Sequence, residues 1–137
     1  MKFLVISDMH GNIENFDKID SVFKEADGVL CAGDFAEFKK TETGKPVLEK
    51  LCTMNEYVFS VIGNCDEPEF TLEIESQDIS VQKGLVFHEG FSIAGSGGGS
   101  IFTGTTPNER TEEDLLKDFE IVENSSEATL KINGTVS

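Results

Sequence analysis

Three short apolar runs in the first half of the chain each end in polar residues. They cover residues 2–6, 29–32 and 57–62, and each has the length of a strand that is covered on both faces. Apolar residues recur at three- and four-residue spacing over residues 12–26, which predicts an amphipathic helix. A second helix is predicted between the second and third runs, where Pro46 suits the first helical turn. This alternation predicts an α/β fold with a parallel sheet.

Beyond residue 66 the pattern changes to shorter strand-like runs, at residues 79–81, 85–87 and 91–94. Residues 88–90 separate the last two runs and predict a hairpin turn. The glycine-rich residues 95–100 predict a flexible loop, and no helix begins directly after them as a phosphate-binding loop would require.

An acidic helix is predicted next. Thr111, followed by three acidic residues, has the pattern of a helix N-terminus, and apolar positions continue at helical spacing to Val122. Eight acidic residues lie between positions 109 and 127, and we interpret them as a solvated face. Residues 124–137 are polar with a few alternating apolar positions, which is typical of an edge strand or a polar tail. The expected domain therefore covers residues 1–123.

Composition narrows the class of protein. The chain has 137 residues, of which 38% are hydrophobic, and this is the size of one domain with its own core. The formal net charge of −15 argues against strong nucleic-acid binding and favours a bound cation. No apolar run has the length of a membrane span or a signal-peptide core, and the three cysteines lack disulfide or zinc spacing. We expect a cytoplasmic protein with free thiols and no membrane partner.

Metal-ligand side chains follow each of the three predicted parallel strands. They are Asp8 and His10 after the first, Asp34 after the second, and Asn64 and Asp66 after the third. Since the carboxyl ends of parallel strands meet at one edge of a sheet, we expect these residues to lie close together. Carboxylate, imidazole and amide donors suit Mn, Fe, Zn, Ni or Mg. Without a cation the clustered carboxylates would repel one another and raise a pKa.

These residues form three ordered motifs: D-x-H (Asp8, His10), G-D (Gly33, Asp34) and G-N-x-[DE] (Gly63, Asn64, Cys65, Asp66). In this order they resemble the motifs of the calcineurin-like metallophosphoesterases, in particular the small prokaryotic phosphodiesterases. The resemblance implies a four-layer α/β/β/α sandwich, of which residues 1–120 would form the first half. It also implies a centre with two divalent metal ions that hydrolyses small phosphomonoesters or phosphodiesters with an activated water. Asp8 and His10 would bind the first ion, and Asp34 would bridge both. Asn64 would bind the second ion and the substrate, and Asp66 would be catalytic.

The chain departs from that family at two places. Cys65 stands where much of the family has a histidine that assists the leaving group, and a thiol is a poorer proton donor. The family also closes its site with later histidines and a G-H-x-H motif, whereas this chain contains only His10 and His88. We interpret His88 as an exposed turn residue and Cys65 as a substitution within the motif, not as a nucleophile. A C-terminally truncated member of the family is therefore expected, with a single bound ion as the alternative to two.

Two functions follow from these patterns. The first is a metal-dependent phosphoesterase. The second is a catalytically inactive half-domain that acts as a binding or assembly module, because an interrupted sandwich would leave an apolar sheet face and an open edge that favour a homo-oligomer. Receiver domains and haloacid-dehalogenase-like phosphatases also carry acidic strand ends, but Met9 and His10 after Asp8 fit neither.

Overall fold

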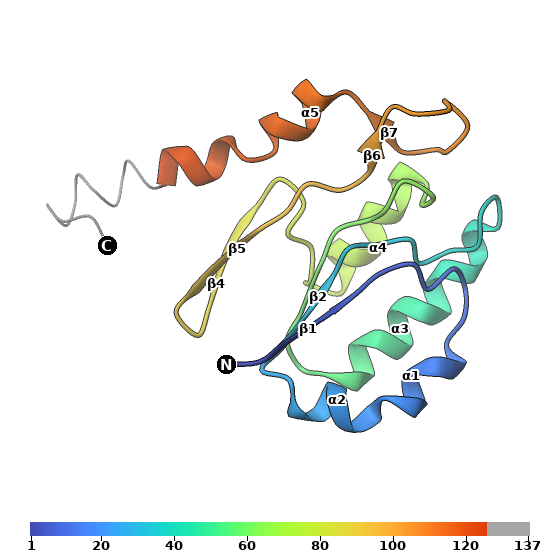
Figure 1. Cartoon of the computed structure of the whole chain (residues 1–137), viewed down its shortest axis with the longest axis vertical. Helices are drawn as coiled ribbons and strands as arrows, with labels where there is room; N and C mark the ends of the chain where they lie inside the picture. The colour runs from blue at the N-terminus through green and yellow to red at the C-terminus, as the bar shows by residue number, and fades with distance from the viewer. Residues whose placement is uncertain (126–137) are drawn as a thin grey trace, which may run out of the picture.

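The computed structural model describes residues 1–125 and contains a parallel sheet of three strands in the order β1, β2, β3 (Figure 1). The helices that connect these strands along the chain lie along one side of the sheet in Figure 1. Crossover helices between neighbouring parallel strands produce this arrangement, and the predicted α/β class is confirmed. The elements of this part are β1 (Phe3–Ile6), α1 (Glu14–Lys18), α2 (Asp20–Glu25), β2 (Gly28–Cys31), η1 (Thr41–Thr43), α3 (Gly44–Met54), β3 (Val58–Ser60), η2 (Pro68–Phe70) and α4 (Thr71–Ser76).

The single helix predicted over residues 12–26 is two short helices, α1 and α2. The break is at Ile19, whose φ of −118° and ψ of 26° lie outside the helical region. Phe16 of α1 and Phe23 of α2 are both buried, and their rings meet edge to face at 5.6 Å. Ile19 itself continues the apolar stripe, so the hydrophobic pattern does not reveal the break.

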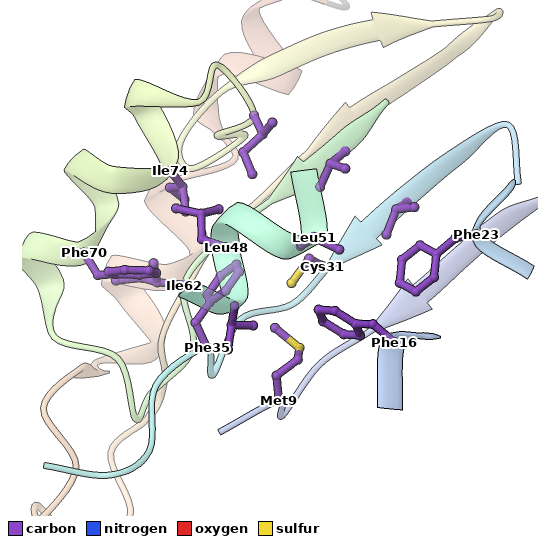
Figure 2. Packing of buried hydrophobic residues seen from close by; sticks show 14 residues of the cluster. Met9, Phe16, Phe23, Cys31, Phe35, Leu48, Leu51, Ile62, Phe70 and Ile74 are labelled. Carbon is purple, nitrogen blue, oxygen red and sulfur yellow. The ribbon is translucent and has the colours of Figure 1, made fainter. Parts of the chain in front are cut away.

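The core lies between the sheet and the helices. Leu4, Val29 and Val58 are paired across the three strands, and all three belong to the core cluster or pack against it. Leu48 and Leu51 of α3 are buried in the same core cluster (Figure 2). Full burial of such a side chain stabilises a fold by about 1.5–3 kcal/mol. This packing fixes the sheet edge at which the three motifs lie.

A β-hairpin lies beside the other face of the sheet. Strands β4 (Leu85–His88) and β5 (Phe91–Ala94) are antiparallel, and Glu89 and Gly90 between them both have positive φ angles, as in the tight turns that join twisted strands. The predicted hairpin is confirmed. The strand predicted over residues 79–81 contributes only an isolated parallel bridge from Ser80 to Ser60 of β3.

The sheet face opposite the helices is covered only in part by the described residues. Val5, Leu30 and Phe59 line an open cavity of about 250 Å³ together with Ile93 of the hairpin. Val5 remains 66% exposed. Of the layers that the resemblance implies, residues 1–125 therefore show a helix layer and a parallel sheet, with the hairpin beside the second face.

The glycine-rich segment is held by hydrogen bonds, in contrast to the predicted flexible loop. The Gly97 amide donates to the Gln82 side chain at 2.5 Å, and the Gly98 amide donates to the Ile62 carbonyl at 2.9 Å. The segment ends in the short strand β6 (Gly99–Ser100), which pairs in parallel with β7 (Glu109–Arg110). Distant partners make these bonds, so local composition could not reveal them.

Helix α5 (Glu112–Lys117) begins where the sequence predicts, because the Thr111 hydroxyl accepts the Asp114 amide at 3.1 Å. It ends earlier than the predicted position 122, and residues 120–125 form a separate helical segment. Of the predicted tail or edge strand at 124–137, the first two residues are helical, and residues 126–137 lie outside the described part of the chain. None of the helices formed by residues 1–125 is both long and apolar enough to cross a membrane.

The interpretation of the acidic region as a solvated face is wrong for Asp118 and incomplete for Glu109. Asp118 is only 3% exposed, and the Arg110 guanidinium donates to its carboxylate at 2.6 Å. Burial alone would raise the pKa of Asp118, but the hydrogen bonds and charge of Arg110, with help from Ser96 and Gln82, hold it below its usual value. Glu109 accepts hydrogen bonds from backbone amides of the loop that precedes it. Both carboxylates are therefore structural.

Candidate metal centre

The loops after β1 and β2 run side by side and present the candidate ligands. The Asp8 amide donates to the Gly33 carbonyl and the His10 amide to the Asp34 carbonyl, each at 3.0 Å. Asp8, His10 and Asp34 all have left-handed backbone conformations, with φ of 60°, 47° and 59°. Such conformations are strained for residues with a side chain and cluster at functional sites. Hydrogen bonding between the loops holds all three in place.

One ligand atom from each of Asp8, His10 and Asp34 lies within 4.8 Å of the other two. A hydrogen bond to the backbone orients the ring of His10. Its Nδ1 lies 3.3 Å from the carbonyl oxygen of Ala36, and since a carbonyl oxygen can only accept, Nδ1 is the donor. Nε2 then faces Asp8 Oδ1 at 3.3 Å. A histidine held through one nitrogen with the other nitrogen among carboxylates has the orientation of a metal ligand. The donor set therefore fits a divalent ion.

The electrostatics of the cluster also favour a cation. Asp34 is 8% exposed, and burial, reinforced by the nearby carboxylates of Asp8 and Asp66, raises its pKa. The hydrogen bond from the Ser7 hydroxyl, at 2.6 Å, instead lowers the pKa of Asp8. The repulsion between carboxylates that the sequence predicts is thus present at Asp34. A divalent ion between these groups would offset it.

Asp66 joins the second and third motifs. Its carboxylate accepts the backbone amides of Asp34 at 2.8 Å, Gly63 at 2.9 Å and Ala36 at 3.1 Å. The side chain is 1% exposed. Through these contacts Asp66 positions the backbone of Asp34. The catalytic role of Asp66 that the resemblance implies stays a prediction.

Two motif glycines permit the loops after β2 and β3 to touch. A Cβ on Gly33 would lie 2.0 Å from the Gly63 amide nitrogen, and a Cβ on Gly63 would lie 2.0 Å from Asp34 Oδ1. Neither approach is possible with a side chain, so glycine is required at both positions. This contact places the third motif directly against the Asp34 carboxylate.

Comparison with known proteins agrees with this geometry. Residues 1–120 match the family described as the calcineurin-like phosphoesterase superfamily domain. The chain belongs to this superfamily. It is also 34% identical over 118 residues to an uncharacterized protein of Methanocaldococcus jannaschii, MJ1162. That match covers 84% of this chain but 51% of the relative, so the chain spans about half of the relative's length.

Within this phosphoesterase domain, His88 lies away from the three candidate ligands. Its Nε2 is 2.8 Å from the carbonyl of Asp27, which directly precedes β2, and its ring packs against Tyr57 and Phe59. It therefore sits at the end of the strands opposite Asp8, His10 and Asp34. The expected exposed turn residue is in fact half-buried, because the hairpin folds back onto the sheet.

The surroundings of Cys65, in the third motif, disfavour the thiolate that a nucleophilic cysteine requires. Burial and the neighbouring carboxylates of Asp34 and Asp66 raise the pKa of its thiol. Its backbone amide donates to Asp34 Oδ1 at 2.9 Å. The contribution of this position to the site is thus a backbone hydrogen bond, which any residue except proline supplies.

Asn64 directly follows Gly63 in the third motif, and its side chain contacts the loop between β6 and β7. Its Nδ2 lies 3.3 Å from Thr106 Oγ1, and its backbone carbonyl accepts the Asn108 amide at 3.0 Å. Asn108 also donates through Nδ2 to the Gly63 carbonyl at 3.2 Å. Sequence reasoning missed Thr106 and Asn108, because residues 101–108 carry no motif and both residues lie more than 40 positions from Asn64.

Proposed function

We propose that this protein is a metal-dependent phosphoesterase whose metal site includes Asp8, His10 and Asp34. The observation that carries the proposal is the convergence of these three ligand atoms within 4.8 Å in a chain of the calcineurin-like phosphoesterase superfamily. Small phosphodiesters or phosphomonoesters are the proposed substrates. Mn, Ni, Fe or Zn, with Mg as a further candidate, are the proposed ions.

Each residue has a distinct part in this proposal. Asp8 and His10 would hold one ion, Asp34 would be shared with a second ion, and Asn64 would bind that second ion and a substrate oxygen. A bound ion would supply an activated water nucleophile and neutralise charge on the phosphate. The chain's own contribution is orientation: Ala36 holds the His10 ring, and Asp66 holds the backbone of Asp34.

Two further expectations belong to the proposal. A cytoplasmic location is supported by the three free cysteines, which form no disulfide. The alternative of a catalytically inactive binding module would rest on the open apolar face around Val5, but the family match and the ligand cluster favour the enzyme.

The test measures metal content and hydrolysis of bis(p-nitrophenyl) phosphate by the full chain in Mn²⁺. We expect bound metal, hydrolysis above the no-enzyme rate, and loss of both in Asp34→Ala, because the central ligand is removed. Asp78→Ala is the matched control, since Asp78 is exposed and has the same φ of 59° as Asp34. Metal-loaded protein that is no faster than the no-enzyme control would refute the proposed function.

A further inference from the structure

The loop between β6 and β7 is built around the Glu109 carboxylate. Oε1 accepts the amides of Phe102 at 2.7 Å and Gly104 at 3.0 Å. Oε2 accepts both the amide of Thr106, at 2.9 Å, and its hydroxyl, at 2.7 Å. The whole loop is thereby closed onto one side chain. Figure 1 shows it at the same end of the molecule as the loops after the parallel strands.

The bond to Glu109 determines what Thr106 can offer Asn64. A hydroxyl has one hydrogen, and a carboxylate only accepts, so the Thr106 hydrogen is committed to Glu109. Thr106 Oγ1 can then act toward Asn64 only as an acceptor. The Asn64 atom that faces it at 3.3 Å must therefore be the donor Nδ2 and not the carbonyl oxygen Oδ1.

The backbone of Asn64 is held by the same loop. Asn108 binds the Asn64 carbonyl through its amide and the Gly63 carbonyl through its side chain. With the backbone fixed and Nδ2 turned to Thr106, Oδ1 points to the other side of the amide. Divalent ions bind amides through oxygen, whereas a reversed amide would present its NH2 group to the cation.

We propose that Glu109, acting through Thr106, sets the orientation of the Asn64 amide so that Oδ1 is available to a divalent ion. Glu109 and Thr106 are then positioning residues for the metal centre. The inference rests on the proposed function, because it assigns Asn64 to the second ion of that centre. It makes the loop of residues 101–108 part of the site.

The experiment titrates the full chain with Mn²⁺ alone and counts bound ions and their affinities by calorimetry and electron paramagnetic resonance. In Thr106→Val the hydroxyl is lost, and we expect the weaker Mn²⁺ site to lose about 10- to 100-fold in affinity, as for other groups that orient ligands. The tighter site at Asp8, His10 and Asp34 should be unchanged, which also reports correct folding. Thr106→Ser should restore the weaker site, and Thr105→Val is the control in the same loop.

A second measurement tests the orientation without metal. In NMR spectra of the metal-free chain, the Asn64 side-chain NH2 protons should show contacts to Thr106, and these should disappear in Thr106→Val. The inference is overturned if Thr106→Val binds Mn²⁺ as the wild type does, or if the Asn64 NH2 protons show no contact to Thr106. Absence of any Mn²⁺ binding by the wild type would instead overturn the proposed function.

Discussion

Among the individual residues of the candidate site, Asp66 has a structural role. It is buried, and it is bound by three backbone amides that belong to two different loops. An ionised carboxylate can accept all three hydrogen bonds, because each of its oxygens has free lone pairs. It thereby links the loop that carries Asp34 to the loop that carries Asn64.

Asp66→Asn tests this link. The amide keeps the shape of the side chain but has one accepting oxygen, so at least one of the three buried amides would face an NH2 group. We expect the free energy of unfolding to fall by about 3 kcal/mol, measured by urea denaturation. Asp17→Asn, which affects an exposed ion pair with Lys50, should change it by less than about 1 kcal/mol. Equal stability of wild type and Asp66→Asn would contradict the assignment.

Among the elements, β7 connects the candidate site to the C-terminal helices. Arg110 of β7 donates to the Gly97 carbonyl at 3.0 Å and to the Asp118 carboxylate at 2.6 Å. Ser96 and Gln82 donate to the same carboxylate, each at 2.8 Å. The glycine-rich segment, β7 and α5 are thus held around one buried ion pair. Glu109, which precedes Arg110 in β7, binds the amides of the loop between β6 and β7, and Thr106 of that loop contacts Asn64.

The loop between β6 and β7 should loosen in acid. Three backbone amides and the Thr106 hydroxyl lower the pKa of Glu109 from 4.5 to about 2. Because the folded pKa lies below the unfolded one, this stabilisation is complete above about pH 4.5 and is lost as the pH falls toward 2. We expect hydrogen-exchange protection of the Phe102, Gly104 and Thr106 amides to decrease over that range.

Glu109→Gln is the matched variant for this pH dependence. It should weaken protection of the same amides at neutral pH and remove the acid dependence that Glu109 causes. The amide of Val29, which donates to Tyr57 inside the sheet, is an internal reference in the same sample. Constant protection of the loop in the wild type across the whole range would show that Glu109 does not close it.

At the scale of the whole molecule, residues 1–125 cover one side of the sheet well and the other only in part. The helices bury the core, while Val5, Leu30 and Phe59 face a cavity that the hairpin closes only in part. Phe91 of the hairpin is also exposed. An apolar surface of this kind favours association, and we expect the described domain to form a homo-oligomer.

Light scattering after size-exclusion chromatography tests this expectation. The wild type should elute at a multiple of the monomer mass, and Val5→Lys should return it to the monomer, because a charge on the open face opposes its burial. Leu72→Lys is the matched control: Leu72 is 68% exposed, close to the 66% of Val5, but it lies on α4. A monomeric wild type at all concentrations would show that the face does not bind a second copy.

The sequence by itself determined the strand and helix order of the first half, the edge at which Asp8, His10 and Asp34 meet, and the superfamily. These features depend on local periodicity and on short motifs at strand ends, and both can be recognised from the order of residues along the chain. Only the tertiary structure revealed the break at Ile19, because the apolar pattern continues through it. The tertiary structure decided the burial of Asp118, because Arg110, Ser96 and Gln82 from other parts of the chain bind its carboxylate. It also decided the contact of Thr106 with Asn64, since a hydrogen bond between residues 42 positions apart leaves no periodic trace in the chain.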